Sequence, residues 1–254
     1  MQRRRFIQIA ASLGGVTLCP QLLRAQQLKP VRWQGYTMGA VGQFTLYTHQ
    51  TETAQDILKT CFAEIQRLEK IFSLYDPNSE LSRLNRAGSS AQLSADLQTV
   101  LHAVDQANRI TCGKFDPTVQ PLWELYQQHF ADHPNDRQGP SSSKIHAALQ
   151  QTGWEQVQWN GTSLSFARSG MSLTLNGIAQ GYITDRITER LKDAGYGNVL
   201  VELGETRAIG PHPKQRPWHI GIQQPGQSGF DRVIDLEDQA LATSGSYGTQ
   251  FSQD

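Results

Sequence analysis

Two patterns of apolar and polar residues cover most of the chain after residue 30. Residues 31–49 alternate apolar and polar side chains on both sides of a glycine-containing turn, which predicts a β-hairpin. Residues 53–72 repeat apolar side chains every three or four positions, which predicts a long amphipathic helix. A second helix is expected from Ser94, a good N-cap residue, to Gly113. Polar tracts rich in turn residues predict two loops, the second of them exposed and mobile, at residues 75–90 and 127–143.

The second half of the chain alternates short strands with helices. Residues 173–210 predict an extended run, a turn containing Gly177 and Gly181, a helix that ends at Gly195, a strand over 198–203 and a glycine corner. Together the elements predict one α+β domain over residues 31–254, with antiparallel or mixed sheets and packed helices. The remaining elements expected are a short helix at 144–152, two or three short strands within 154–175, and strands at 218–223, 233–236 and 240–244.

The turn around Gly177 and Gly181 is a candidate ligand site. A glycine turn that opens a helix presents backbone N–H groups and the positive end of the helix dipole, which suit a nucleotide diphosphate or a metal–phosphate complex. The same turn also serves to pack a helix on a sheet, so this segment alone assigns no ligand.

Composition argues against two classes of protein. The chain has 23 basic and 23 acidic residues and no long basic block, so nucleic-acid binding is not expected. Its mean hydropathy of −0.48 also argues against an integral membrane protein.

Residues 1–25 have the features of an export signal. Arg3 and Arg4, followed by Phe6 and a short apolar run, match a twin-arginine signal, so we expect a periplasmic protein. Cys19 raises the alternative of a lipid-anchored protein, although bulky Leu18 precedes it where a small residue is preferred.

A few other residues have reactive or metal-binding side chains but do not form a recognisable catalytic or metal-binding motif. Cys61 and Cys112 could pair in an oxidising compartment, but burial as free thiols is the preferred interpretation. His129 and His133 have a metal-binding spacing, yet their polar surroundings favour a solvated surface. Ser244 lies in a glycine turn without a recognisable His/Asp pair, so it is interpreted as a ligand contact and not as a nucleophile.

Five separated motifs stand out along the chain: SLYDPNSELSRLN at 73–85, TCGKFDPTVQPLW at 111–123, NGIAQGY at 176–182, LGE at 203–205 and LATSGSY at 241–247. Together they resemble the ApbE family, the bacterial FAD:protein FMN transferases, and the resemblance runs from Met38 to the last residue. NGIAQGY and LGE are most similar to the branch associated with nitrous-oxide reductase maturation.

The resemblance implies a set of site residues. Gly177 would offer its main-chain carbonyl to Mg²⁺, which prefers oxygen ligands. Taken alone, Asp116 equally fits a residue that caps the turn before Thr118. The residues implied to bind the flavin nucleotide are Met38, Tyr75, Lys114, Phe115, Asp116, Thr174, Gln180, Thr243 and Ser244.

The resemblance also implies a reaction. FMN would pass from FAD to a Thr or Ser hydroxyl of an acceptor flavoprotein in a Mg²⁺-dependent step that releases AMP, so no nucleophile of the chain itself is needed. A non-catalytic periplasmic flavin-binding or maturation protein and an FAD pyrophosphatase remain as alternatives. Members of the family continue past the TSGSY motif with a histidine, an Asp and a Thr of the metal site, whereas this sequence stops at Asp254. We expect a fragment of a longer protein, and a truncated, inactive member of the family is the alternative.

Overall fold

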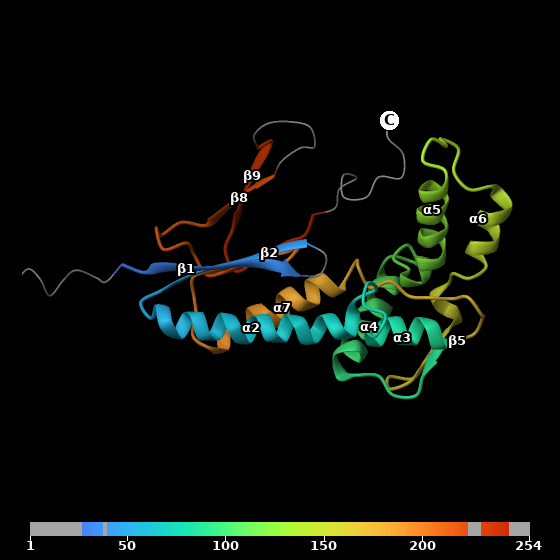
Figure 1. The fold of residues 1–254 in the computed structure, drawn as a ribbon. Coiled ribbons are helices and arrows are strands. Elements are labelled where there is room, and N and C mark those ends of the chain that lie inside the picture. Colours follow the sequence, from blue (N-terminus) through green and yellow to red (C-terminus); the bar gives the residue numbers. More distant parts are fainter. Residues whose placement is uncertain (1–26, 38–39, 223–229, 244–254) are drawn as a thin grey trace, which may run out of the picture.

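The computed structural model describes residues 27–37, 40–222 and 230–243. Its main element is a five-stranded antiparallel sheet with the strand order β1-β2-β6-β7-β10 (Figure 1). The first two strands form the hairpin that the alternation predicted, with Thr37 opposite Ala40 at its tip. The strands are β1 (Lys29–Thr37), β2 (Ala40–Thr48), β6 (Val199–Glu202), β7 (Thr206–Ile209) and β10 (Ala240–Leu241).

Two long helices, α2 (Thr51–Phe72) and α7 (Ala179–Asp193), cover one face of this sheet (Figure 1). Alternate residues of β6 point to opposite faces, as the pleat of a strand requires. Val199 and Val201 belong to the core with the helices, whereas Leu200 packs with Trp218 on the other face. That second face carries the hairpin of β8 (Trp218–Ile222) and β9 (Arg232–Leu236).

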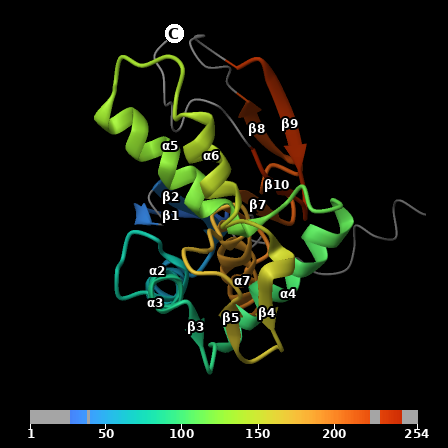
Figure 2. The same cartoon turned by 90° about the vertical axis from the view of Figure 1, so that its right-hand side faces the viewer.

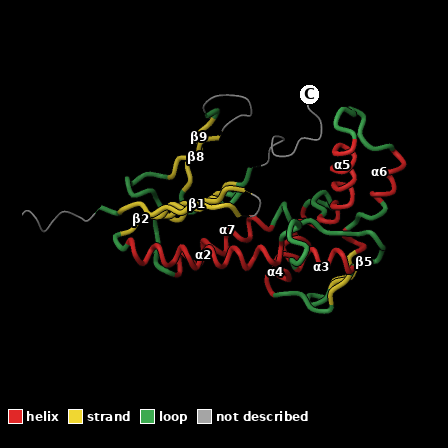
Figure 3. The backbone as a smooth tube through the Cα atoms, in the orientation of Figure 1, coloured by secondary structure: helices red, strands yellow, loops and turns green. Residues whose placement is uncertain are grey.

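A second, mostly helical region adjoins one end of the sheet and its two helices (Figures 1 and 2). It also contains a small antiparallel sheet with the order β3-β5-β4, which Figure 3 separates by colour from the helices around it. Its elements are α3 (Glu80–Ala87), β3 (Ser89–Ser90), α4 (Ala95–Ile110), the 3₁₀ turn η2 (Pro117–Val119), α5 (Gln120–Asp132), α6 (Ser142–Leu149), the 3₁₀ turn η3 (Trp154–Gln156), β4 (Val157–Trp159) and β5 (Leu164–Phe166).

The predicted α+β class is confirmed, and so are most of the predicted helices. Ser94 caps α4, because its hydroxyl accepts the N–H of Leu97 at 3.3 Å. The helix that follows the glycine turn is α7, and Gly195 stands just after it with φ +84°. Among the described helices, none is both long and apolar enough to cross a membrane.

Two predicted loops are each wrong in part. The tract 75–90 contains α3, which Ser79 caps by accepting the N–H of Ser82 and which Gly88 ends in the left-handed conformation. Polar composition hid this helix because only Leu81 and Leu84 of its eight residues are buried. The tract 127–143 begins inside α5, which continues to Asp132 before the chain turns.

The extended run at Leu173 and Leu175 is buried but is not part of a sheet. The side chain of Asn85 takes the place of a neighbouring strand: its Nδ2 donates to the Leu173 carbonyl at 2.8 Å, and its Oδ1 accepts the Leu173 N–H at 2.8 Å. A side chain 88 residues away in sequence satisfies this backbone, so local alternation could not distinguish it from a strand.

The two described cysteines do not pair. Cys61 is buried on the inner face of α2, as predicted, and burial raises the pKa of its thiol to about 11. The predicted burial of Cys112 is wrong, because this residue is exposed at the end of α4 with φ +53°.

Candidate functional site

The loops that carry the predicted site residues meet at one end of the five-stranded sheet. There the tip of the β1–β2 hairpin, the β6–β7 turn and the first turn of α7 lie together, as their contacts show. A Cβ atom on Gly42 would come within 2.7 Å of both Thr37 and Leu203, and a Cβ atom on Gly204 would come within 2.9 Å of the Gln180 Nε2. The side chain of Gln180 therefore rests against the glycine corner of the LGE motif.

A cavity of about 550 Å³ opens beside this end of the sheet. It lies between the last turn of α2, the loop that follows this helix and the segment that enters α7. Tyr75 and Gln180, both predicted as ligand contacts, line it together, and Tyr75 is 81% exposed. An exposed phenol ring beside an amide offers a flat apolar surface and two polar groups, which suits a heteroaromatic ring. The full lining is Tyr36, Glu69, Phe72, Ser73, Leu74, Tyr75, Asn176 and Gln180.

One partly buried hydrogen bond stabilises the wall of the cavity. The Thr37 hydroxyl donates to Glu69 Oε1 at 3.1 Å, which ties the end of β1 to the last turns of α2. The predicted contact Met38, which follows Thr37 in the sequence, lies outside the described residues. Sequence reasoning did not find Glu69, since an acid near the end of an amphipathic helix carries no distinctive signal.

A second group of predicted residues forms a corner next to the cavity. A Cβ atom on Gly177 would lie 3.4 Å from the Phe115 ring, so the absence of a side chain at Gly177 lets this ring lie close to the turn. The N–H of Thr174 donates to the carbonyl of Pro117 at 2.8 Å, and the N–H of Asn176 donates to the Thr174 hydroxyl at 3.3 Å. Asn176 lines the cavity, so the 174–180 segment connects the corner to the cavity wall, although Phe115, Thr174 and Gly177 are not themselves part of the lining.

Asp116 supports the fold of this corner with both of its carboxylate oxygens. Oδ1 accepts the N–H of Thr118 at 2.8 Å and its hydroxyl at 2.6 Å, while Oδ2 accepts the N–H of Trp154 at 3.2 Å. The interpretation of Asp116 as a turn cap is therefore correct, and its contact with a flavin stays a prediction. Lys114 is exposed beside this corner and does not line the cavity of the described residues.

Glu205 is a further acid at the same end of the sheet. Burial raises the pKa of its carboxyl above the usual range, and a hydrogen bond from the N–H of Thr243 partly opposes this rise. That bond places the predicted contact Thr243 beside the LGE corner. Ser244, the next predicted contact, lies outside the described residues.

Comparison with known proteins assigns the family. The model of the ApbE family matches residues 38–254, which is most of the chain. The chain belongs to the ApbE family.

Relatives in sequence and in structure agree with this assignment. The FAD:protein FMN transferase of Vibrio cholerae is 34% identical over 251 residues, covering 94% of this chain and 74% of that protein. The same-named protein of Chlamydia pneumoniae is 28% identical and covers 74% of this chain, which spans 57% of its length. Among solved structures, the flavin transferase ApbE of Vibrio cholerae has a TM-score of 0.75 at 27% identity and covers 89% of this chain and 74% of the other. The apo form of the Pseudomonas stutzeri flavinyl transferase ApbE has a TM-score of 0.75 at 28% identity, covering 87% of this chain and 70% of the other.

The Mg²⁺ predicted from the resemblance to the ApbE family finds few ligands in the part of the chain that the structure describes. Within these ranges no three His, Cys, Asp or Glu side chains gather in a metal-binding group. The carbonyl of Gly177 is a suitable oxygen ligand, but a hard cation needs several. The spaced histidines do not form a metal site either: His129 Nε2 lies 2.7 Å from Asp136 Oδ2, and its ring stacks on His133 with centroids 4.9 Å apart. With its side chain only 12% exposed, His129 also differs from the solvated residue that was expected.

Proposed function

We propose that this ApbE family member transfers FMN from FAD to a hydroxyl group of an acceptor flavoprotein. The family membership supports the reaction class, since the curated relatives are FAD:protein FMN transferases. The observation that carries the proposal to this chain is the shared cavity of Tyr75 and Gln180, with the Phe115–Gly177 contact next to it in the same chain segment as Asn176 and Gln180.

The arrangement suits a dinucleotide in two ways. The exposed ring of Tyr75 and the ring of Phe115 offer flat surfaces to heteroaromatic rings. The 174–180 segment leads into the N-terminus of α7, where the positive end of the helix dipole favours phosphate oxygens. A ligand with two ring systems joined by a diphosphate matches that distribution.

In the proposed reaction the acceptor's Thr or Ser oxygen attacks the phosphorus of the FMN half. The new bond is a phosphoester to the acceptor, and the bond that breaks joins the FMN phosphorus to the bridging oxygen. AMP leaves with that oxygen and the electron pair, and the proton of the hydroxyl passes to solvent or to the departing AMP. The chain's own residues bind and align FAD, because alignment of the attacking oxygen contributes a large share of the rate in such a transfer. Mg²⁺, when bound, would neutralise charge on the diphosphate, and no step is assigned to it because the described residues supply only one clear ligand.

We also propose export of the protein to the periplasm through the twin-arginine route. Arg3, Arg4 and Phe6 motivate this, and they lie outside the described residues. Replacing both arginines by lysine is expected to leave the precursor in the cytoplasm in a fractionation experiment. Normal export of that variant would refute the proposed route.

The test of the transferase combines two measurements. The purified protein is incubated with FAD, Mg²⁺ and a flavin-acceptor domain, then covalent flavin fluorescence on a denaturing gel and AMP in the supernatant are quantified. Equal amounts of both products are expected, and both should fall in the Tyr75→Ala variant. AMP without labelled acceptor would instead identify a pyrophosphatase, and FAD binding without AMP would identify a flavin-binding protein.

A further inference from the structure

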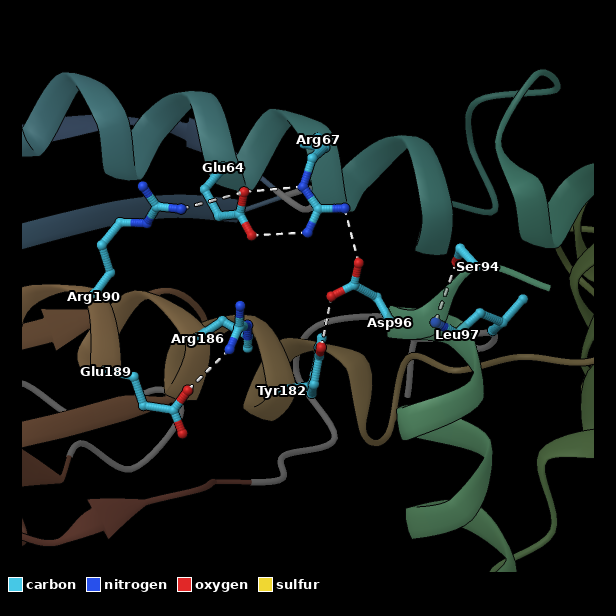
Figure 4. A network of polar contacts seen from close by, with 9 residues as sticks. All are labelled: Glu64, Arg67, Ser94, Asp96, Leu97, Tyr182, Arg186, Glu189 and Arg190. Atoms are coloured by element: carbon cyan, nitrogen blue, oxygen red, sulfur yellow. Dashed lines mark hydrogen bonds and ion pairs between the residues drawn. The ribbon is translucent and has the colours of Figure 1, made fainter. Parts of the chain in front are cut away.

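We propose that Tyr182, held by Asp96 and Arg67, is a positioning residue that sets the 174–180 segment against the rest of the candidate site. The inference rests on the proposed function, because it names a residue that acts through this segment and not by contact with FAD. The three residues come from three different helices, α7, α4 and α2 (Figure 4).

Asp96 is the centre of this contact. Its Oδ1 accepts the Tyr182 hydroxyl at 2.7 Å, and its Oδ2 accepts Arg67 Nη1 at 2.8 Å. Figure 4 shows the carboxylate between the other two side chains. Because both oxygens are engaged, Asp96 joins α7 to α2 through the first turn of α4.

Arg67 is itself held in place. Its Nε and Nη2 donate to the two oxygens of Glu64 at 2.9 and 2.8 Å, one turn earlier on α2. A planar guanidinium bound in this bidentate way has little freedom to rotate, so its remaining nitrogen presents a fixed donor to Asp96. Arg190 approaches the same Glu64 carboxylate at 3.8 Å and adds a second contact from α7.

Each of the three helices adjoins a segment of the candidate site in the sequence. α2 ends at Phe72, before the loop of Tyr75, and α4 ends before the 114–116 corner. Tyr182 stands two positions after Gln180, and its ring meets Phe72 edge-on with centroids 5.7 Å apart. Phe72 and Gln180 both line the 550 Å³ cavity. A shift of Tyr182 would therefore move a wall of the cavity and one of its polar groups together.

The charge states agree with this geometry. Burial would raise the pKa of Asp96, but hydrogen bonds from Arg67 and Tyr182 outweigh it and hold this pKa below its usual range. Burial, followed by the bond to Asp96, raises the pKa of Tyr182 to about 12. At neutral pH the phenol thus keeps its proton as a donor and the carboxylate remains an acceptor.

The test uses Tyr182→Phe, which removes only the hydroxyl and keeps the ring against Phe72. Asp96→Ala is the second variant, since it removes the acceptor of the same hydrogen bond. Glu189→Gln is the matched control on α7, because Glu189 forms an exposed ion pair with Arg186 at 3.2 Å, outside this contact. Two quantities are measured: amide hydrogen exchange over residues 176–182 without FAD, and the dissociation constant of FAD by flavin fluorescence.

Tyr182→Phe and Asp96→Ala are each expected to speed exchange over this segment and to weaken FAD binding about tenfold, which corresponds to ~1.4 kcal/mol. The double variant should be little worse than Asp96→Ala alone, because that change already removes the hydrogen bond from Tyr182. Unchanged exchange and affinity in Tyr182→Phe would overturn the inference, as would an equal effect of Glu189→Gln. If the parent protein binds no FAD, the proposed function fails, while the exchange comparison still decides whether Tyr182 positions the segment.

Discussion

Gly204→Ala offers a sharp test of the site because its neighbour is a predicted ligand contact. Gly204 has φ +92°, and an added Cβ would lie 2.9 Å from Gln180 Nε2 and 3.0 Å from its Cδ. These atoms belong to the free end of a flexible side chain, so Gln180 can swing away from the turn. The substitution should therefore move Gln180 without reshaping the backbone of the sheet.

The size of the effect follows from a comparison with Gly195→Ala. Gly195 has φ +84° and nothing within 4 Å of an added Cβ, so that variant has only the backbone strain. An alanine in the left-handed region costs about 1–2 kcal/mol, which corresponds to a fall in Tm of roughly 2–8 °C for a chain of this size. We expect a similar fall in Tm in both variants, because rotating the Gln180 side chain adds little to the cost in free energy.

FAD binding separates the two variants. Thermal unfolding without ligand gives the stability, and a fluorescence titration gives the dissociation constant. Gly204→Ala should weaken FAD binding about as much as Gln180→Ala does, whereas Gly195→Ala should bind FAD like the parent. The reasoning is refuted if Gly204→Ala binds FAD normally while Gln180→Ala does not, or if both glycine variants weaken binding equally.

Three further outcomes are expected. Tyr75→Ala should leave Tm unchanged, because the ring is 81% exposed, yet weaken FAD binding; normal affinity in a titration would remove Tyr75 from the site. Asp116→Ala should lower stability by about 1–2 kcal/mol through the lost turn cap, and a denaturant titration without FAD that shows no loss would contradict the hydrogen bonds to Thr118 and Trp154. The free energy of unfolding should fall as pH rises from 9 toward 11, because the pKa of Cys61 is raised to about 11 in the folded protein and its thiol ionises more readily in the unfolded chain. Cys61→Ala should reduce this dependence of stability on pH, and an unchanged dependence would exclude Cys61 as its source.

The elements that sequence predicted well are those whose signals are local. The β1–β2 hairpin alternates along its own length, and α2 repeats its apolar positions over 22 residues. The helix after Gly177 has a start, an apolar stripe and a glycine stop within one stretch. In each case the residues that decide the structure are close in sequence, so their periodicity is enough.

The wrong predictions concern residues whose structural partners are distant in the sequence or whose local signal is weak. The sequence predicts a strand at Leu173, but the side chain of Asn85 makes hydrogen bonds to both its N–H and its carbonyl in place of a neighbouring strand. α3 is too short and too polar to show a stripe, and only its end signals, Ser79 and Gly88, mark it. Among the described residues, the Asp96–Tyr182 hydrogen bond joins positions 86 apart, and nothing in the local sequence around either residue predicts this partner.

The predicted site residues also differ in how far the sequence alone could assign their roles. A motif selects residue types, and one type can satisfy two demands: the carboxylate of Asp116 fits a ligand, and it equally fits the N–H groups that it binds in this structure. Loss of activity in an Asp116 variant would therefore not distinguish a broken corner from a lost contact. Tyr75 has no such ambiguity, since its ring is exposed in the cavity and contributes little to the core. Evidence for the flavin site should accordingly come from Tyr75 and Gln180, with Asp116 interpreted only beside a measurement of stability.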